Sequence, residues 1–312
     1  MSTPTVAPPF LVLAPYDRPP LIWGTERWLL SDRPGQASTV PRGPFAGATL
    51  TDLVDRLGAR LTGGAGLRPD GRLRLLLKLL QTHDRLSVQV HPGHEHLSRL
   101  PPTAESKEEA WLVLGVLPGA RIYLGARPGC TPVAFDQALQ RGRVEDELAW
   151  FEPTVGDVVH VRPGTLHAIG AGLTLAEVQE SSDTTYRVWD WGRLEDGRPR
   201  TLHLDEARQV LRFEGVASSD RRVGGGALPK ACTELLQVAP FRMAWRVGGG
   251  SVAAPRDAFV ACTLLSGSAE VVAGSERARV EVGETVFVPP GAAPMVSPGP
   301  AAAFLEVSTA AG

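Results

Sequence analysis

Short apolar runs that alternate with polar residues make up most of the chain, and glycine and proline separate them. The 34 glycines and 27 prolines are spread between these Val/Leu/Ile runs and form no low-complexity tract. Strands joined by tight turns have this pattern, because alternation gives a strand one buried face while glycine and proline supply the turns. The sequence therefore predicts a mainly β protein.

Two segments have apolar residues at helical spacing. "TLTDLVDRLGA" begins at Thr49, which can cap a helix, and "TPVAFDQALQRG" begins at Thr131, which is followed by a proline suited to the first helical position. The apolar run "GRLRLLLKLLQ" from Gly71 shows no clear period, and we interpret it as a strand. We expect few and short helices.

One motif occurs twice. "GDVVHVRPGTLH" at 156–167 reappears at 283–294 as "GETVFVPPGAAP". A turn glycine, an acidic residue, a short strand and a Pro-Gly turn form a β-barrel unit, so the duplication predicts two similar barrels in tandem. His160 and His167 of the first copy are replaced by Phe287 and Pro294, and the second barrel therefore lacks these imidazoles.

The segment "FEGVASSDRRVGGGALP" is polar, rich in glycine and without period. Such a composition is typical of a linker. We therefore predict an N-terminal domain over 1–213, a linker over 214–229 and a C-terminal domain over 230–312.

Composition excludes several classes of function. The chain has 32 basic and 34 acidic residues and no basic block, so nucleic acid is not an expected partner. Its three cysteines (Cys130, Cys232 and Cys262) are too few for a disulfide framework, which fits the cytoplasm. No apolar stretch approaches the roughly 20 residues of a membrane span, so no membrane association is expected.

Potential metal ligands gather in "LSVQVHPGHEH" at 86–96. As a strand, its alternation points Gln89 and His91 to one face. "SKEEAWLVLG" then begins another strand with Glu109 on one face, and His167 follows the Pro-Gly turn. Two histidines, a carboxylate and an amide oxygen suit Zn²⁺ or a similar divalent ion, with positions left open for water or substrate.

Simpler interpretations remain for several of these residues. Glu109 lies in the charged run "ESKEEA", which is typical of a solvated face. His94 and His96 lie in a polar segment and are expected to be surface histidines. His83, His160 and His203 are expected to have structural roles.

Four segments follow one another along the chain: "KLLQTHDRLSVQVHP", "SKEEAW", "VRPGTLHAIGAG" and "EVQESSDTTYRVWDWGR". In this order they resemble class I mannose-6-phosphate isomerases of the short form without the large helical insertion. The resemblance covers residues 22–203. It implies two tandem cupin (jelly-roll) barrels, with one Zn²⁺ in the N-terminal barrel and a degenerate C-terminal barrel. It places the zinc ligands at Gln89, His91, Glu109 and His167.

The resemblance also places a lysine at Lys107 and an Asp-x-x-x-Arg pair at Asp183 and Arg187. Where the family commonly has Lys-Thr-Glu or Lys-Pro-Glu, this chain has Lys107, Glu108 and Glu109. Two adjacent carboxylates are therefore candidates for the metal ligand, and the spacing from Lys107 favours Glu109.

The implied reaction interconverts mannose 6-phosphate and fructose 6-phosphate through an enediol. The metal ion and Arg187 would stabilise the charge that develops on oxygen, Lys107 is a candidate proton carrier, and Asp183 would orient Arg187 or a substrate hydroxyl. Alternatives are an iron cupin dioxygenase and a non-catalytic sugar-phosphate sensor. The sequence does not identify the residues that bind the phosphate, and it does not indicate the oligomeric state.

Overall fold

The computed structural model describes residues 6–215 and 220–309, and these divide into two compact units. Within the described ranges, unit 1 comprises 6–18, 27–79 and 229–309, and unit 2 comprises 19–26, 80–215 and 220–228. Strands β3 (Gly24–Leu30) and β4 (Leu75–Thr82) are each divided between the units. The run from Gly71 thus contains a strand, as predicted. None of the helices in the described ranges has the length and apolar character of a membrane span.

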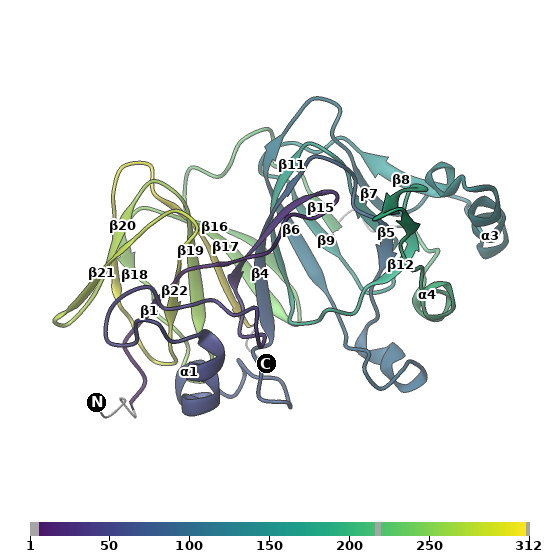
Figure 1. Ribbon diagram of the computed structural model, residues 1–312. Coiled ribbons are helices and arrows are strands. Elements are labelled where there is room, and N and C mark those ends of the chain that lie inside the picture. Colours follow the sequence, from purple (N-terminus) through teal and green to yellow (C-terminus); the bar gives the residue numbers. More distant parts are fainter. Residues whose placement is uncertain (1–5, 216–219, 310–312) are drawn as a thin grey trace. The chain divides into compact units, whose positions relative to one another are not determined.

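Unit 2 consists mainly of short antiparallel strands (Figure 1). Four of them run in the order β15-β9-β6-β11 within one sheet, and five form a second sheet in the order β12-β5-β10-β7-β8. The bounds are β5 Val88–Val90, β6 Glu109–Val116, β7 Ile122–Ala126, β8 Leu148–Phe151, β9 Val158–Val161, β10 His167–Ile169, β11 Leu173–Glu180, β12 Tyr186–Trp189, β13 Leu194–Glu195, β14 Arg198–Pro199 and β15 Arg221–Arg222.

The apolar faces of the two sheets of unit 2 share a core. Trp111 and Leu175 from the first sheet pack in one cluster with Ile122 and Ile169 from the second, all almost fully buried. Alternating side chains make this packing possible, because every second residue of a strand points inward. A polar side chain on such an inner face must find a polar partner, because burying it without one costs free energy.

Four short helical elements lie in the described part of unit 2: η1 His94–Arg99, α3 Pro132–Arg141, η2 Val144–Glu147 and α4 Leu204–Val210. The predicted helix from Thr131 is confirmed as α3, whose Thr131 side chain accepts a hydrogen bond from the Ala134 amide and whose first residue is proline. Figure 1 shows α3 and α4 beside the ends of β8 and β12. They cover the outer side of the five-stranded sheet, where Phe135 and Val210 join its apolar core.

Unit 1 is also built of antiparallel sheets, in the orders β1-β22-β19-β24-β17-β16 and β18-β23-β20-β21. Its helix α1 (Leu50–Leu57) begins after Thr49, as predicted, and Thr49 and Asp52 form a reciprocal cap. The other elements are β1 Leu11–Leu13, β2 Tyr16–Asp17, α2 Ala59–Thr62, β16 Thr233–Gln237, β17 Phe241–Val247, β18 Gly250–Ser251, β19 Val260–Ser266, β20 Ala269–Ala273, β21 Glu276–Val280, β22 Thr285–Val288, β23 Met295–Pro298 and β24 Ala303–Thr309.

The duplicated sequence motif has the same backbone pairing in both units. In unit 2, β6 pairs with β9 so that Ala110 lies opposite His160, and in unit 1, β19 pairs with β22 so that Ala261 lies opposite Phe287. One residue earlier, Glu109 opposes Val161, whereas Val260 opposes Val288. The repeat is therefore structural, and valine stands in unit 1 where unit 2 has its buried glutamate.

The division into units differs from the predicted domain boundaries. Residues 27–79, which the sequence analysis assigned to the N-terminal domain, belong to the same unit as 229–312. Contacts between distant segments are the reason: the Thr285 hydroxyl donates to the Leu29 carbonyl at 2.9 Å, and the Ala65 amide donates to the Asp257 carbonyl at 3.0 Å. Within the predicted linker 214–229, β15 pairs with β9, and 216–219 lie outside the described residues.

Candidate metal centre

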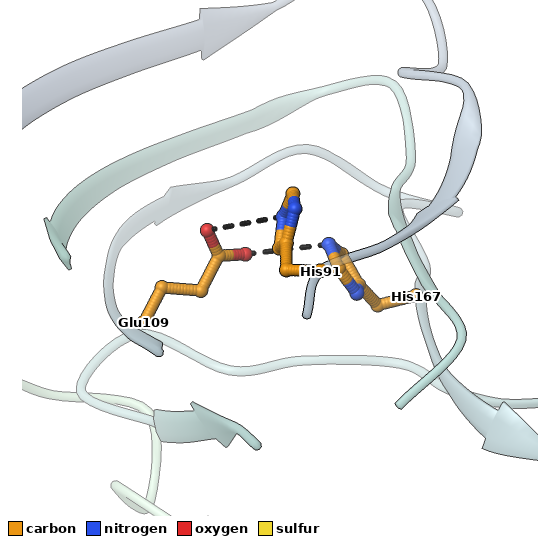
Figure 2. Close-up of side chains that lie close together, drawn as sticks. All are labelled: His91, Glu109 and His167. Atoms are coloured by element: carbon orange, nitrogen blue, oxygen red, sulfur yellow. Dashed lines mark ion pairs between the residues drawn. The ribbon is translucent and has the colours of Figure 1, made fainter. Parts of the chain in front are cut away.

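Three buried side chains of unit 2 meet at one point. The potential ligand atoms of His91, Glu109 and His167 all lie within 4.8 Å of one another. One Glu109 oxygen lies 3.5 Å from His91 Nε2 and the other 3.3 Å from His167 Nε2. Figure 2 shows the carboxylate facing both imidazole rings. The structure thus brings together three of the four predicted ligands.

Both sheets of unit 2 contribute to this cluster. His91 directly follows β5 and His167 begins β10, while Glu109 begins β6 of the other sheet. The Pro-Gly turn before β10 is held in place because the Gly164 amide donates to the His91 carbonyl at 2.8 Å. Gly164 has φ of +82°, and an added Cβ would lie 2.7 Å from a backbone oxygen. The motif therefore needs glycine at this position to place His167.

Hydrogen bonds to the backbone fix the orientation of both rings. His91 Nδ1 lies 2.9 Å from the Thr184 carbonyl, and His167 Nδ1 lies 2.9 Å from the Thr165 carbonyl. A carbonyl accepts only, so each Nδ1 carries the proton and each Nε2 turns its lone pair towards Glu109. Burial lowers the pKa of His167, which favours the neutral ring that a metal ion requires.

Two more polar groups complete the cluster. The Gln89 amide nitrogen lies 3.3 Å from His167 Nε2, and Gln89 is the cross-strand partner of His167. The Lys107 ammonium lies 2.8 Å from a Glu109 oxygen and 3.2 Å from His91 Nε2. Both Lys107 and Glu109 are buried, so the interpretation of "ESKEEA" as a wholly solvated face is wrong for these two residues.

Glu108 and Glu109 point to different partners. The Glu108 carboxylate lies 2.6 Å from His160 Nε2, whereas Glu109 faces His91 and His167. Consecutive residues of a strand point to opposite faces, which explains the separation. Of the two adjacent carboxylates, Glu109 is the one that lies beside the histidines.

The donor set fits a divalent metal ion of the zinc class. Two neutral imidazole nitrogens, one carboxylate and a neighbouring amide are nitrogen and oxygen donors that Zn²⁺ accepts. With so few protein ligands, a coordination position remains for water or substrate. The chain therefore holds a buried metal-capable group.

No protein-family model matches the chain. The mannose-6-phosphate isomerase of Streptococcus mutans is 31% identical over 281 residues, which are 88% of this chain and 85% of that protein. The chain belongs to the mannose-6-phosphate isomerase family. The crystal structure of the mannose 6-phosphate isomerase of Bacillus subtilis is 26% identical and superposes with a TM-score of 0.79 over 96% of this chain and 99% of that one.

A more distant mannose 6-phosphate isomerase shares the fold. Its structure, described as bound with zinc and yttrium, has a TM-score of 0.72 at 15% identity, over 97% of this chain and all of that one. The mainly β architecture predicted from the sequence is therefore confirmed as the cupin-type fold of the isomerase family.

The remaining residues that the isomerase family suggested lie in or beside β12. Arg187 is the cross-strand partner of Gln89, which is in turn the partner of His167. Directly opposed residues of antiparallel strands extend from the same face. Arg187 therefore extends from the face that carries Gln89 and His167. Asp183 lies before β12 and is exposed.

The other histidines have varied environments. His96 was expected at the surface but is buried, and its Nδ1 accepts a hydrogen bond from the amide of Gly93, the residue before η1. His94 is exposed, as expected. His160 is buried between Glu108 and Asp220, and His203 accepts a hydrogen bond from the Arg187 amide, while His83 is exposed.

Gln179, a fully buried residue directly opposite Glu109 on β11, was not predicted to support the site. Its amide nitrogen donates to the carbonyls of Glu180 and Ser182 at 2.8 and 2.9 Å. These bonds hold the start of the turn that carries Thr184, whose carbonyl orients His91. "EVQESSDTT" gave no sign of this, because the bonds run to backbone groups that any residue would supply.

Proposed function

We propose that this protein interconverts mannose 6-phosphate and fructose 6-phosphate with one Zn²⁺ held by Gln89, His91, Glu109 and His167. The observation that carries the proposal is the buried cluster in which both Nε2 lone pairs face the Glu109 carboxylate, in a chain of the mannose-6-phosphate isomerase family. The ion would supply positive charge beside the sugar oxygens on which negative charge develops.

The residues around the cluster suit proton transfer between C1 and C2. Lys107 lies at the cluster with its ammonium in contact with Glu109 and His91, so we assign it the transfer of a proton at Nζ. The Arg187 guanidinium would stabilise the enediolate oxygens, because it extends from the same sheet face as Gln89. The exposed carboxylate of Asp183 would orient a substrate hydroxyl or Arg187.

A coupled assay tests this function directly. Purified protein should form fructose 6-phosphate from mannose 6-phosphate, lose this activity after treatment with a chelator and regain it when Zn²⁺ is added back. A zinc-loaded protein without isomerase activity would refute the proposal and favour a sugar-phosphate sensor. An enzyme that requires iron for activity would favour dioxygenase chemistry.

We expect one tightly bound zinc ion per chain. In the repeat of unit 1, Val260 stands where unit 2 has Glu109, and Phe287 and Pro294 stand where the first copy has His160 and His167. Neither valine, phenylalanine nor proline has a side chain that binds metal. Elemental analysis of the active protein should give a zinc-to-chain ratio near one. A ratio near two, with both ions required for turnover, would contradict the assignment of the C-terminal barrel as degenerate.

A further inference from the structure

A second arginine lies beside Arg187 on the segment that follows the hairpin β13–β14. The His203 amide donates to the Arg187 carbonyl at 2.8 Å, and Arg187 Nη1 donates to the Thr201 carbonyl at 2.8 Å. Because β12 is the outermost strand of its sheet, the segment 201–203 runs along the edge opposite β5. Arg200 directly precedes this segment, and its charge lies close enough to Arg187 to act on it electrostatically.

The charge of Arg187 is poorly compensated within the described part of the chain. Its guanidinium forms no ion pair there, its hydrogen-bond acceptor is the neutral Thr201 carbonyl, and Nε is buried without an acceptor. Burial and the neighbouring charge of Arg200 lower the pKa of Arg187, and the carboxylates of Asp190 and Glu195 oppose this only in part. Two cations close together in a partly buried region raise the free energy of the folded protein unless an anion joins them.

Arg200 itself has only distant carboxylates. Its side chain is 15% exposed, and it lies 3.7 Å from Asp190 and 3.7 Å from Glu195, both beyond hydrogen-bond range. Nη1 of Arg200 is buried and has no hydrogen-bond acceptor among the described residues. Asp190 is engaged by Arg193 at 2.6 Å, and Arg193 also pairs with Asp84 at 3.0 Å. Arg193 therefore has two close ion pairs, although its Nε also lacks an acceptor among the described residues, whereas the two ion pairs of Arg200 are both 3.7 Å long.

Side-chain contacts hold the segment that leads into the hairpin β13–β14 in place. Trp191 adopts φ of +60°, which is costly for a residue with a side chain. Its indole nitrogen donates to the Leu86 carbonyl at 2.6 Å, and Arg85 stacks over its ring at 3.9 Å. These contacts, together with the Arg193 ion pairs, anchor the hairpin whose end carries Arg200. A guanidinium that extends from an anchored backbone and has a donor without an acceptor is suited to an anion, because binding orders the side chain alone.

We propose that Arg200 binds the phosphate group of the sugar substrate, next to Arg187 at the reacting oxygens. This inference rests on the proposed function. A phosphate monoester carries a charge of about −1.5 to −2 at pH 7, and arginine binds it through two parallel N–H donors. His167 pairs with Gln89, and Gln89 pairs with Arg187. With Arg200 next to Arg187, the metal-binding residues would lie at one end of the site and the phosphate at the other.

The test compares Arg200→Ala with Arg198→Ala, a control that removes an exposed arginine from the same hairpin. Losing a charge-assisted hydrogen bond should raise KM for mannose 6-phosphate about 10- to 100-fold while kcat changes little. Arg198→Ala should behave as wild type. Zinc content and the unfolding midpoint should show that Arg200→Ala is folded and loaded. An unchanged KM, or a fall in kcat alone, would overturn the proposal.

A direct binding measurement separates this inference from the proposed function. Inorganic phosphate, titrated by calorimetry into the zinc-loaded protein, should bind wild type and Arg198→Ala alike and Arg200→Ala about 10- to 100-fold more weakly. This result would support the subsite even if the isomerase assay failed. Equal phosphate affinity in all three proteins would refute the subsite even if the isomerase assay succeeded.

Two further variants test whether Arg200 binds phosphate if Arg200→Ala does not fold. Arg200→Lys keeps the positive charge without the planar fork, and Arg200→Gln keeps a polar chain without charge. The lysine variant should retain more phosphate affinity than the glutamine variant. Equal affinities of these two variants and of wild type would assign Arg200 a structural role.

Discussion

Replacing His91 or His167 by alanine is expected to abolish isomerase activity and to remove the metal ion. Each imidazole presents Nε2 to the shared point beside Glu109, and each would supply one of the few protein ligands. Loss of one ligand from a four-ligand zinc site leaves too few donors for tight binding. Elemental analysis after dialysis, together with the coupled assay, measures both effects.

The fold should survive these substitutions. Packing in the surrounding strands comes from apolar residues such as Val88, Val90 and Ala168, which the substitutions leave in place. Circular dichroism should remain that of a β protein, with a lowered unfolding midpoint. His83→Ala is the matched control, because it removes an exposed histidine of the same unit and should keep both zinc and activity. Full zinc occupancy in His91→Ala or His167→Ala would refute the ligand assignment.

The sequence predicted the parts of the site that follow from strand periodicity. Alternation in "SVQVH" placed Gln89 and His91 on one face, and the Pro-Gly motif placed His167 at the start of a strand. The structure has Gln89 opposite His167, and His91 beside it in the cluster. Periodicity is local, so a single sequence suffices to predict it.

Contacts made across the fold were not predictable in this way. The carbonyl of Thr184 orients His91 from a turn far along the chain, and a backbone carbonyl has no sequence signature. The pairing of β1 with β22 also escaped prediction, because nothing in Leu11–Leu13 indicates a partner near Phe287. The contacts of residues 27–79 with the C-terminal segment were also not predictable, so these residues were assigned to the N-terminal domain, although they belong to the same compact unit as 229–312.

Within the candidate site, the proximity of the two arginines also depends on contacts that the sequence does not reveal. Arg187 was identified through the resemblance to mannose-6-phosphate isomerases, and its pairing with Gln89 puts it on the face that carries Gln89 and His167. No sequence motif pointed to Arg200. Its proximity to Arg187 depends on the return of the segment 201–203 along the edge of β12, which brings the two cations together.

Arg187→Ala is expected to lower kcat by on the order of 10² to 10³, the range found when one preorganised charge-stabilising donor is removed. The enediolate carries negative charge that the sugar ground state lacks, so a guanidinium near those oxygens stabilises the transition state more than the substrate. KM should change less than kcat. Steady-state kinetics on the zinc-loaded variant measure both constants.

Arg187→Ala and Arg200→Ala are expected to change different kinetic constants. Arg200→Ala should act on KM and Arg187→Ala on kcat, because the phosphate is present in both ground and transition states while the enediolate charge arises only in the latter. Zinc content should stay at the wild-type ratio in both variants, since neither arginine is a proposed ligand. A near-normal kcat in zinc-loaded Arg187→Ala would remove Arg187 from the mechanism. A rise in KM alone would instead reassign Arg187 to the phosphate, where it would act together with Arg200.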